Sequence, residues 1–142
     1  MAKASKTVVM KASKDSIMSV LKDYESYIDF MDGVSSVEVK SRDGSHVKVT
    51  YGLNIIKKFS YTIDLTEAEN ELSWVLDSGD LFSTNSGSWK LKDLGDGTTE
   101  VDYSVEVDIK VKMIGTGMIV KKLTEVQLPI MLKAVEQRAK SK

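Results

Sequence analysis

The stretch Glu100–Lys112, which reads EVDYSVEVDIKVK, decides the fold. Apolar residues from Val101 to Val111 occupy every second position, and charged or polar residues occupy the positions between them. Successive side chains of a β-strand point to opposite faces of a sheet. This alternation therefore predicts a strand with one buried face and one face in water, as in an antiparallel sheet.

The same period of two extends back along the chain to Val34 and predicts six strands between residues 34 and 111. Asp43-Gly44 is a hairpin signal between the first two of them, because both residues tolerate the backbone angles of a tight turn. A second turn, Leu94–Gly97, precedes the last strand. Strands joined by such short turns pair as antiparallel neighbours.

Further elements flank this series of strands. Residues 6–12 are rich in β-branched and apolar types and predict one earlier strand. Ser13 can cap a following helix whose apolar face comprises Ile17, Met18, Val20 and Leu21. A second short helix is expected from Tyr24 to Met31. At the other end, apolar residues recur at spacings of three and four, which predicts a long helix from Gly115 to about Arg138.

Two consequences follow from this order of elements. Pro129 lies inside the long helix and removes a backbone donor, which predicts a bend there. A sheet of about six or seven strands is roughly 30 Å wide, whereas a helix is about 10–12 Å across. We therefore expect residues 1–142 to form a single α+β domain, in which a curved antiparallel sheet wraps around the C-terminal helix and leaves a cavity between them.

The composition excludes several classes of function. A net charge of −1 argues against electrostatic binding of nucleic acid. The chain has no cysteine and one histidine, so it cannot form a cysteine-based metal site. No apolar run is long enough to span a bilayer, and the first residues have no hydrophobic stretch that could act as a secretion signal. We expect a cytoplasmic protein.

Aromatic residues on the inward parity of the strands are the main candidates for lining the cavity: Tyr51, Phe59, Tyr61, Trp74, Trp89 and Tyr103. Ordinary core packing explains any single one of them. Three inward tyrosines together favour a cavity. Each buried hydroxyl needs a hydrogen-bond partner, and a dry core rarely contains so many such groups. The long helix adds four candidates, namely Met118, Leu123, Gln127 and Ile130.

The inward positions carry little catalytic chemistry. They offer tyrosines, Asn85 and Gln127 but no histidine or carboxylate, which favours a binding protein over an enzyme. His46 follows a hairpin turn on the outward parity, without a second histidine or cysteine to complete a metal site. The acidic row from Glu100 to Asp108 is expected to face water and to pair with lysines of a neighbouring strand. No catalytic residue, metal or cofactor is predicted.

Four stretches resemble sequences of a known superfamily: Val20–Met31, Ser86–Leu91, Asp96–Thr99 and Leu128–Ala139. The first of them is similar to a D-Y-x-x-Y-P-x-F pattern that follows the first helix. The superfamily is the START-like, or helix-grip, superfamily, and the branch is the bacterial polyketide cyclase/dehydrase and lipid-transport branch. This branch includes coenzyme-Q-binding proteins and ribosome-association toxins. The chain departs from the family by having Ile28 and Asp32 where proline is common.

The resemblance implies binding or transport of a hydrophobic small molecule, such as a lipid, an isoprenoid or quinone, or a polyketide-like compound. Two alternatives stay open. An enzyme of the polyketide cyclase/dehydrase type would use cavity side chains to orient a polyketide chain. An interaction module similar to the ribosome-association toxins would instead use the outer surface, for example the basic pair Lys57-Lys58.

Overall fold

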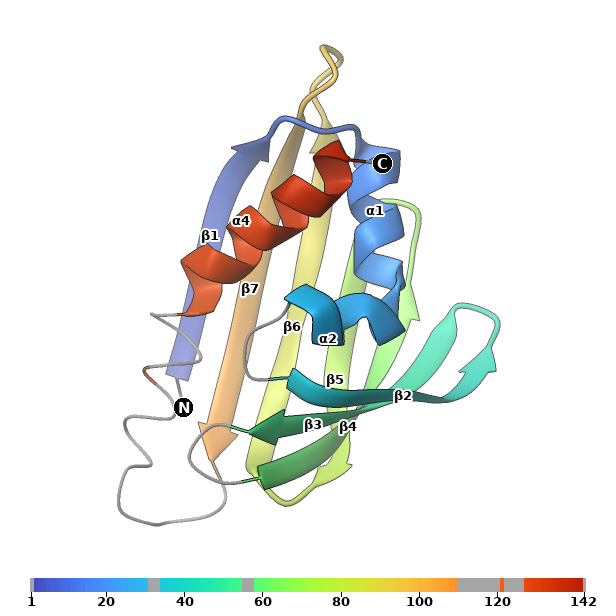
Figure 1. Ribbon diagram of the computed structural model, residues 1–142, viewed down its shortest axis with the longest axis vertical. Helices are drawn as coiled ribbons and strands as arrows, with labels where there is room; N and C mark the ends of the chain where they lie inside the picture. The colour runs from blue at the N-terminus through green and yellow to red at the C-terminus, as the bar shows by residue number, and fades with distance from the viewer. Residues whose placement is uncertain (1, 31–33, 55–57, 110–120, 122–126, 142) are drawn as a thin grey trace.

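The computed structural model describes residues 2–30, 34–54, 58–109, 121 and 127–141, and within these ranges seven antiparallel strands form one sheet. Its spatial order is β1-β7-β6-β5-β4-β3-β2 (Figure 1). The strands are β1 (Ala2–Met10), β2 (Val34–Asp43), β3 (His46–Asn54), β4 (Lys58–Glu67), β5 (Glu71–Gly79), β6 (Phe82–Asp93) and β7 (Thr99–Ile109). The antiparallel sheet predicted from the alternating pattern is therefore confirmed.

The helices lie on one face of this sheet, as Figure 1 shows. They are α1 (Lys14–Lys22), the 3-10 helix η1 (Tyr24–Ser26), α2 (Tyr27–Phe30) and α4 (Gln127–Lys140). Ser13 caps α1 as predicted, because its Oγ accepts a hydrogen bond from the Ser16 amide at 3.1 Å. Within the described residues, no helix is long and apolar enough to cross a membrane.

Three expected features differ from the structure or lie outside the described residues. The first strand begins at Ala2 rather than at residue 6, because β1 pairs along its whole length with β7. The second short helix is divided into η1 and α2, since the Ser26 amide donates to the Asp23 carbonyl three residues earlier. The start of the long helix and the peptide groups on which a bend at Pro129 depends lie outside the described residues.

Among the described residues, buried apolar side chains form two clusters. The larger cluster joins α1 and α4 to the sheet and includes fully buried residues such as Leu21, Val49 and Val135. The smaller cluster comprises Leu53, Phe59, Leu81, Phe82, Val107 and Ile109. Four partly buried residues pack against both clusters, namely Val34, Tyr61, Leu76 and Val105. The apolar interior is thus divided, and the site described next lies where the two clusters meet.

Candidate ligand cavity

A cavity of about 170 Å³ lies between the sheet, α2 and α4. Its lining includes Leu53, Phe82 and Val107 of the smaller cluster together with side chains of the larger one. Six of the residues predicted from the sequence line it: Tyr51, Tyr61, Trp74, Trp89, Tyr103 and Ile130. Ile130 is 52% exposed, so the cavity reaches the surface beside the first turns of α4.

The other four predicted residues do not extend this set. Phe59 is buried in the smaller cluster but is not part of the cavity lining, although its partner in the β3–β4 ladder, Leu53, does line the cavity. Met118 and Leu123 lie outside the described residues. Gln127 begins α4, and its side chain lies outside the described part of the chain.

Aromatic rings form one wall of the cavity along β3, β4 and β6. Tyr27 stacks on Tyr51 with ring centroids 6.0 Å apart, and Tyr51 stacks on Tyr61 at 5.5 Å. Tyr61 meets the edge of Phe82 at 5.0 Å. Offset and edge-to-face contacts of this kind hold each ring in place. The wall is therefore rigid and apolar over most of its area.

A second aromatic group covers β5, β6 and β7. The Tyr103 ring lies 4.5 Å from the Trp89 ring and 5.9 Å from the Trp74 ring, measured between centroids. The Trp74 indole lies against the backbone of Gly87: a Cβ atom at position 87 would be only 2.6 Å from its Cζ2 atom. Gly87 thus allows the indole to approach the sheet closely.

Polar groups of the lining are few and buried. The Trp74 Nε1–H donates a hydrogen bond to Asn85 Oδ1 at 3.0 Å, and Asn85 is 7% exposed. Among the described residues, none forms a hydrogen bond with the hydroxyl groups of Tyr51, Tyr61 or Tyr103. Burial raises the pKa of all three hydroxyls above the usual value, so they stay protonated near neutral pH.

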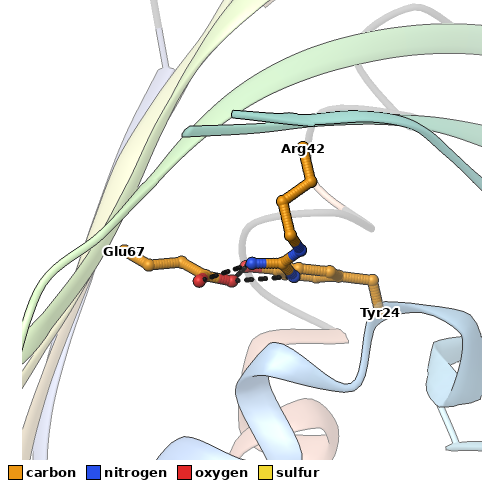
Figure 2. A network of polar contacts seen from close by, with 3 residues as sticks. All are labelled: Tyr24, Arg42 and Glu67. Atoms are coloured by element: carbon orange, nitrogen blue, oxygen red, sulfur yellow. Dashed lines mark hydrogen bonds and ion pairs between the residues drawn. The ribbon is translucent and has the colours of Figure 1, made fainter. Parts of the chain in front are cut away.

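A polar network outside the cavity holds the segment that carries Tyr27. Figure 2 shows its three side chains, which come from η1, β2 and β4. The Tyr24 hydroxyl donates to Glu67 Oε2 at 2.6 Å, and the Arg42 guanidinium donates to both oxygens of Glu67 at 2.9 and 3.4 Å. The Tyr27 hydroxyl in turn donates to the Leu21 carbonyl oxygen. The Tyr24 bond fixes η1 against the sheet, and the Tyr27 bond joins α2 to α1.

We expect the substitution Glu67→Gln to lower the free energy of unfolding by about 1 kcal/mol at pH 7, because the charge of the bidentate pair is lost while the Tyr24 bond can persist. Burial disfavours the charged Glu67, but hydrogen bonds from Arg42 and Tyr24 outweigh it and lower its pKa. The stabilisation is therefore complete above the pKa of the unfolded chain, about 4.3, and disappears as pH falls through the lower pKa of the folded state.

Urea unfolding between pH 7 and pH 3 tests this expectation. The difference between wild type and Glu67→Gln should shrink toward zero at the acidic end. Glu69→Gln is the control, because Glu69 is exposed in the turn between β4 and β5. A difference that is constant over the whole pH range would show that the charge of Glu67 does not stabilise the fold.

The remaining sequence candidates that the structure describes lie on the outer surface, whereas Lys57 of the basic pair Lys57-Lys58 lies outside the described residues. His46 is exposed, and its Nδ1 lies 3.4 Å from Thr66 Oγ1. The prediction for the acidic row is confirmed at Glu106, whose carboxylate lies 3.2 Å from Lys3 Nζ on the neighbouring β1. Among the described residues, no group of histidine and carboxylate side chains could hold a metal ion.

Sequence reasoning missed two parts of this site. Tyr27 lies in the segment predicted only as a second short helix, yet it lines the cavity. The Tyr24–Glu67–Arg42 network joins residues far apart in the chain, and no local pattern signals it. One signal was present for Gly87: a glycine inside a strand marks a close approach of another group to the backbone.

The family model described as "Polyketide cyclase / dehydrase and lipid transport" matches residues 10–136. No curated protein matches this chain. Solved structures are similar over nearly the whole fold. A START superfamily protein from Mycobacterium smegmatis has 25% sequence identity and a TM-score of 0.81, covering 98% of this chain and 97% of its own.

Two further structures have the same fold at lower identity. A protein from Thermus thermophilus is 21% identical with a TM-score of 0.84, and the match covers 99% of this chain and 98% of the other. The Zhui aromatase/cyclase from Streptomyces sp. R1128 is 16% identical with a TM-score of 0.80, covering 98% and 93%. With the family model matching residues 10–136 and a curved seven-stranded sheet packed on a C-terminal helix, this chain belongs to the polyketide cyclase/dehydrase and lipid-transport family and has the helix-grip fold of START-like proteins.

Proposed function

We propose that this protein binds a hydrophobic small molecule in the cavity and releases it chemically unchanged. The observation that supports this most is the chemistry of the lining. Its described residues are apolar or aromatic except for Asn85, and tyrosines are the only ionisable residues among them. Because burial raises their pKa values, these tyrosines act as neutral hydrogen-bonding groups rather than as bases. Such a lining suits orientation of an apolar ligand.

The size of the cavity narrows the ligand. A cavity of about 150 Å³ with an apolar lining is large enough to bind benzene. The volume of about 170 Å³ found here therefore suits one ring with a short substituent. A longer lipid, isoprenoid or polyketide chain would have to extend past Ile130, where the cavity reaches the surface.

A titration with α-methylstyrene, a hydrocarbon with one ring, tests the proposal. We expect saturable NMR shifts of the methyl groups of Val107 and Leu128 and of the indole N–H groups of Trp74 and Trp89, because all four residues line the cavity. Methyl signals of Val9 and Val75, which are exposed, are the internal control and should not move. Shifts that do not saturate, or that are equal at the control residues, would contradict the proposal.

Native mass spectrometry of freshly purified protein separates the carrier from the enzyme. A co-purified compound that keeps its mass on prolonged incubation with the protein supports binding without catalysis. Loss of water from a bound polyketide-like compound would instead favour an enzyme of the cyclase/dehydrase type.

A further inference from the structure

The hydrogen bond between Trp74 and Asn85 fixes the orientation of a buried amide. An indole N–H can only donate, so the atom of Asn85 that faces it at 3.0 Å must be the carbonyl oxygen Oδ1. The two ends of an asparagine amide are otherwise hard to tell apart. Here the chemistry of the partner decides, and the amino group Nδ2 must point away from the indole.

This amino group has two N–H donors and needs acceptors. No described residue accepts a hydrogen bond from it, although Asn85 is more than nine-tenths buried and its side chain lines the cavity. In the described part of the chain, only one side-chain nitrogen or oxygen atom is both fully buried and without a hydrogen-bond partner, and this is Asp64 Oδ1. Asn85 Nδ2 also lacks a partner, so it is not fully buried and is accessible from open space. The Nδ2 donors therefore face the cavity, where a ligand atom can reach them.

We propose that the Asn85 amino group donates a hydrogen bond to a carbonyl oxygen of the ligand, and that the ligand class is small, neutral, ring-containing carbonyl compounds. This inference rests on the proposed function and specifies its ligand. The amide NH₂ group can donate hydrogen bonds but cannot accept them, so it favours a ligand that presents an acceptor. A carboxylate would be unpaired, because the described lining contains no cationic side chain.

The surroundings of Asn85 account for the ring. The Trp74 indole bonded to it also lies 5.9 Å from the Tyr103 ring, and Tyr61 of the other aromatic group lines the same cavity. Planar unsaturated ligands make offset or edge contacts with such rings. The tyrosine hydroxyl groups can donate or accept by rotating, so they add binding without selecting one ligand group over another.

A matched pair of probes tests the inference: acetophenone carries the carbonyl oxygen, and α-methylstyrene has a CH₂ group in its place. Both are titrated into wild type and into Asn85→Leu, which keeps a side chain of similar size but has no donor. For each protein we take the ratio of the two dissociation constants. Comparing this ratio between wild type and Asn85→Leu cancels the difference in hydrophobicity between the two probes. We expect the relative preference for acetophenone to fall by roughly 3- to 10-fold in Asn85→Leu, as for one net hydrogen bond.

Two further measurements, one on wild type and one on a second variant, keep the test decisive if Asn85→Leu does not fold. In wild type, acetophenone should shift the Asn85 side-chain NH₂ signals more than α-methylstyrene does. In Trp74→Phe, which keeps a ring but no longer fixes Oδ1, the preference for acetophenone should fall although Asn85 is present. Equal shifts by both probes and unchanged preferences would overturn the role of Asn85 while leaving the proposed function intact. If neither probe binds to wild type, both the role of Asn85 and the proposed function would be overturned.

Discussion

Replacing Gly87 with alanine should lower the free energy of unfolding by about 3 kcal/mol, close to the upper end of what overpacking a core usually costs. A Cβ atom at this position would be 2.3 Å from the Ser104 carbonyl oxygen and 2.6 Å from Trp74 Cζ2. The first atom belongs to the backbone of β7, which pairs with β6 over its whole length, so it cannot move without disturbing that pairing. The second belongs to a ring held by Tyr103 and Asn85.

Urea unfolding followed by tryptophan fluorescence measures this effect. Ser86→Ala is the matched control, because Ser86 is the preceding residue of the same strand and its side chain points to the other face. It should change the free energy of unfolding by less than about 0.5 kcal/mol. A second measurement divides the cost between its two causes. In a Trp74→Ala background the collision with the indole is gone, so the part of the Gly87→Ala effect that remains reports on the Ser104 carbonyl. A Gly87→Ala protein as stable as wild type would show that neither the Ser104 carbonyl nor the indole lies this close to position 87.

The sheet could be predicted from the sequence because its signal is local. In β7 the inward residues Val101, Tyr103, Val107 and Ile109 are buried and Val105 is partly buried, whereas the residues between them are partly or fully exposed, as the predicted parity requires. The direction in which an inward side chain points is fixed by its parity alone. This is why five of the six aromatic residues on the inward parity line the cavity.

The features that the sequence did not predict have a common physical reason. Parity says that Phe59 points inward, but it does not say whether the side chain reaches the cavity: Phe59 does not, whereas its partner Leu53 does. The bond between Trp74 and Asn85 depends on the register between β5 and β6, which the pattern of one strand cannot specify. Side-chain networks between strands, such as Arg42 with Glu67, depend on the same long-range geometry.

The substitution Val105→Phe should weaken binding of α-methylstyrene by roughly 10- to 100-fold, because a ring placed in the cavity must be displaced before the ligand enters. Val105 lines the cavity, contacts both apolar clusters and lies directly opposite Gly87 in the β6–β7 ladder. Because the Trp74 indole already covers Gly87, the new ring has to extend into the cavity instead. Phenylalanine also favours the strand conformation, so the fold should be retained.

Val75→Phe is the matched control for this experiment. It makes the same change of side chain on β5, but Val75 is 58% exposed and does not line the cavity. Binding of α-methylstyrene is measured by the NMR shifts of Leu128, and the dispersion of the other signals reports whether each variant is folded. The control should bind like wild type. A folded Val105→Phe protein that binds α-methylstyrene as tightly as Val75→Phe does would show that the ligand binds elsewhere. The cavity between the two apolar clusters would then have no part in function.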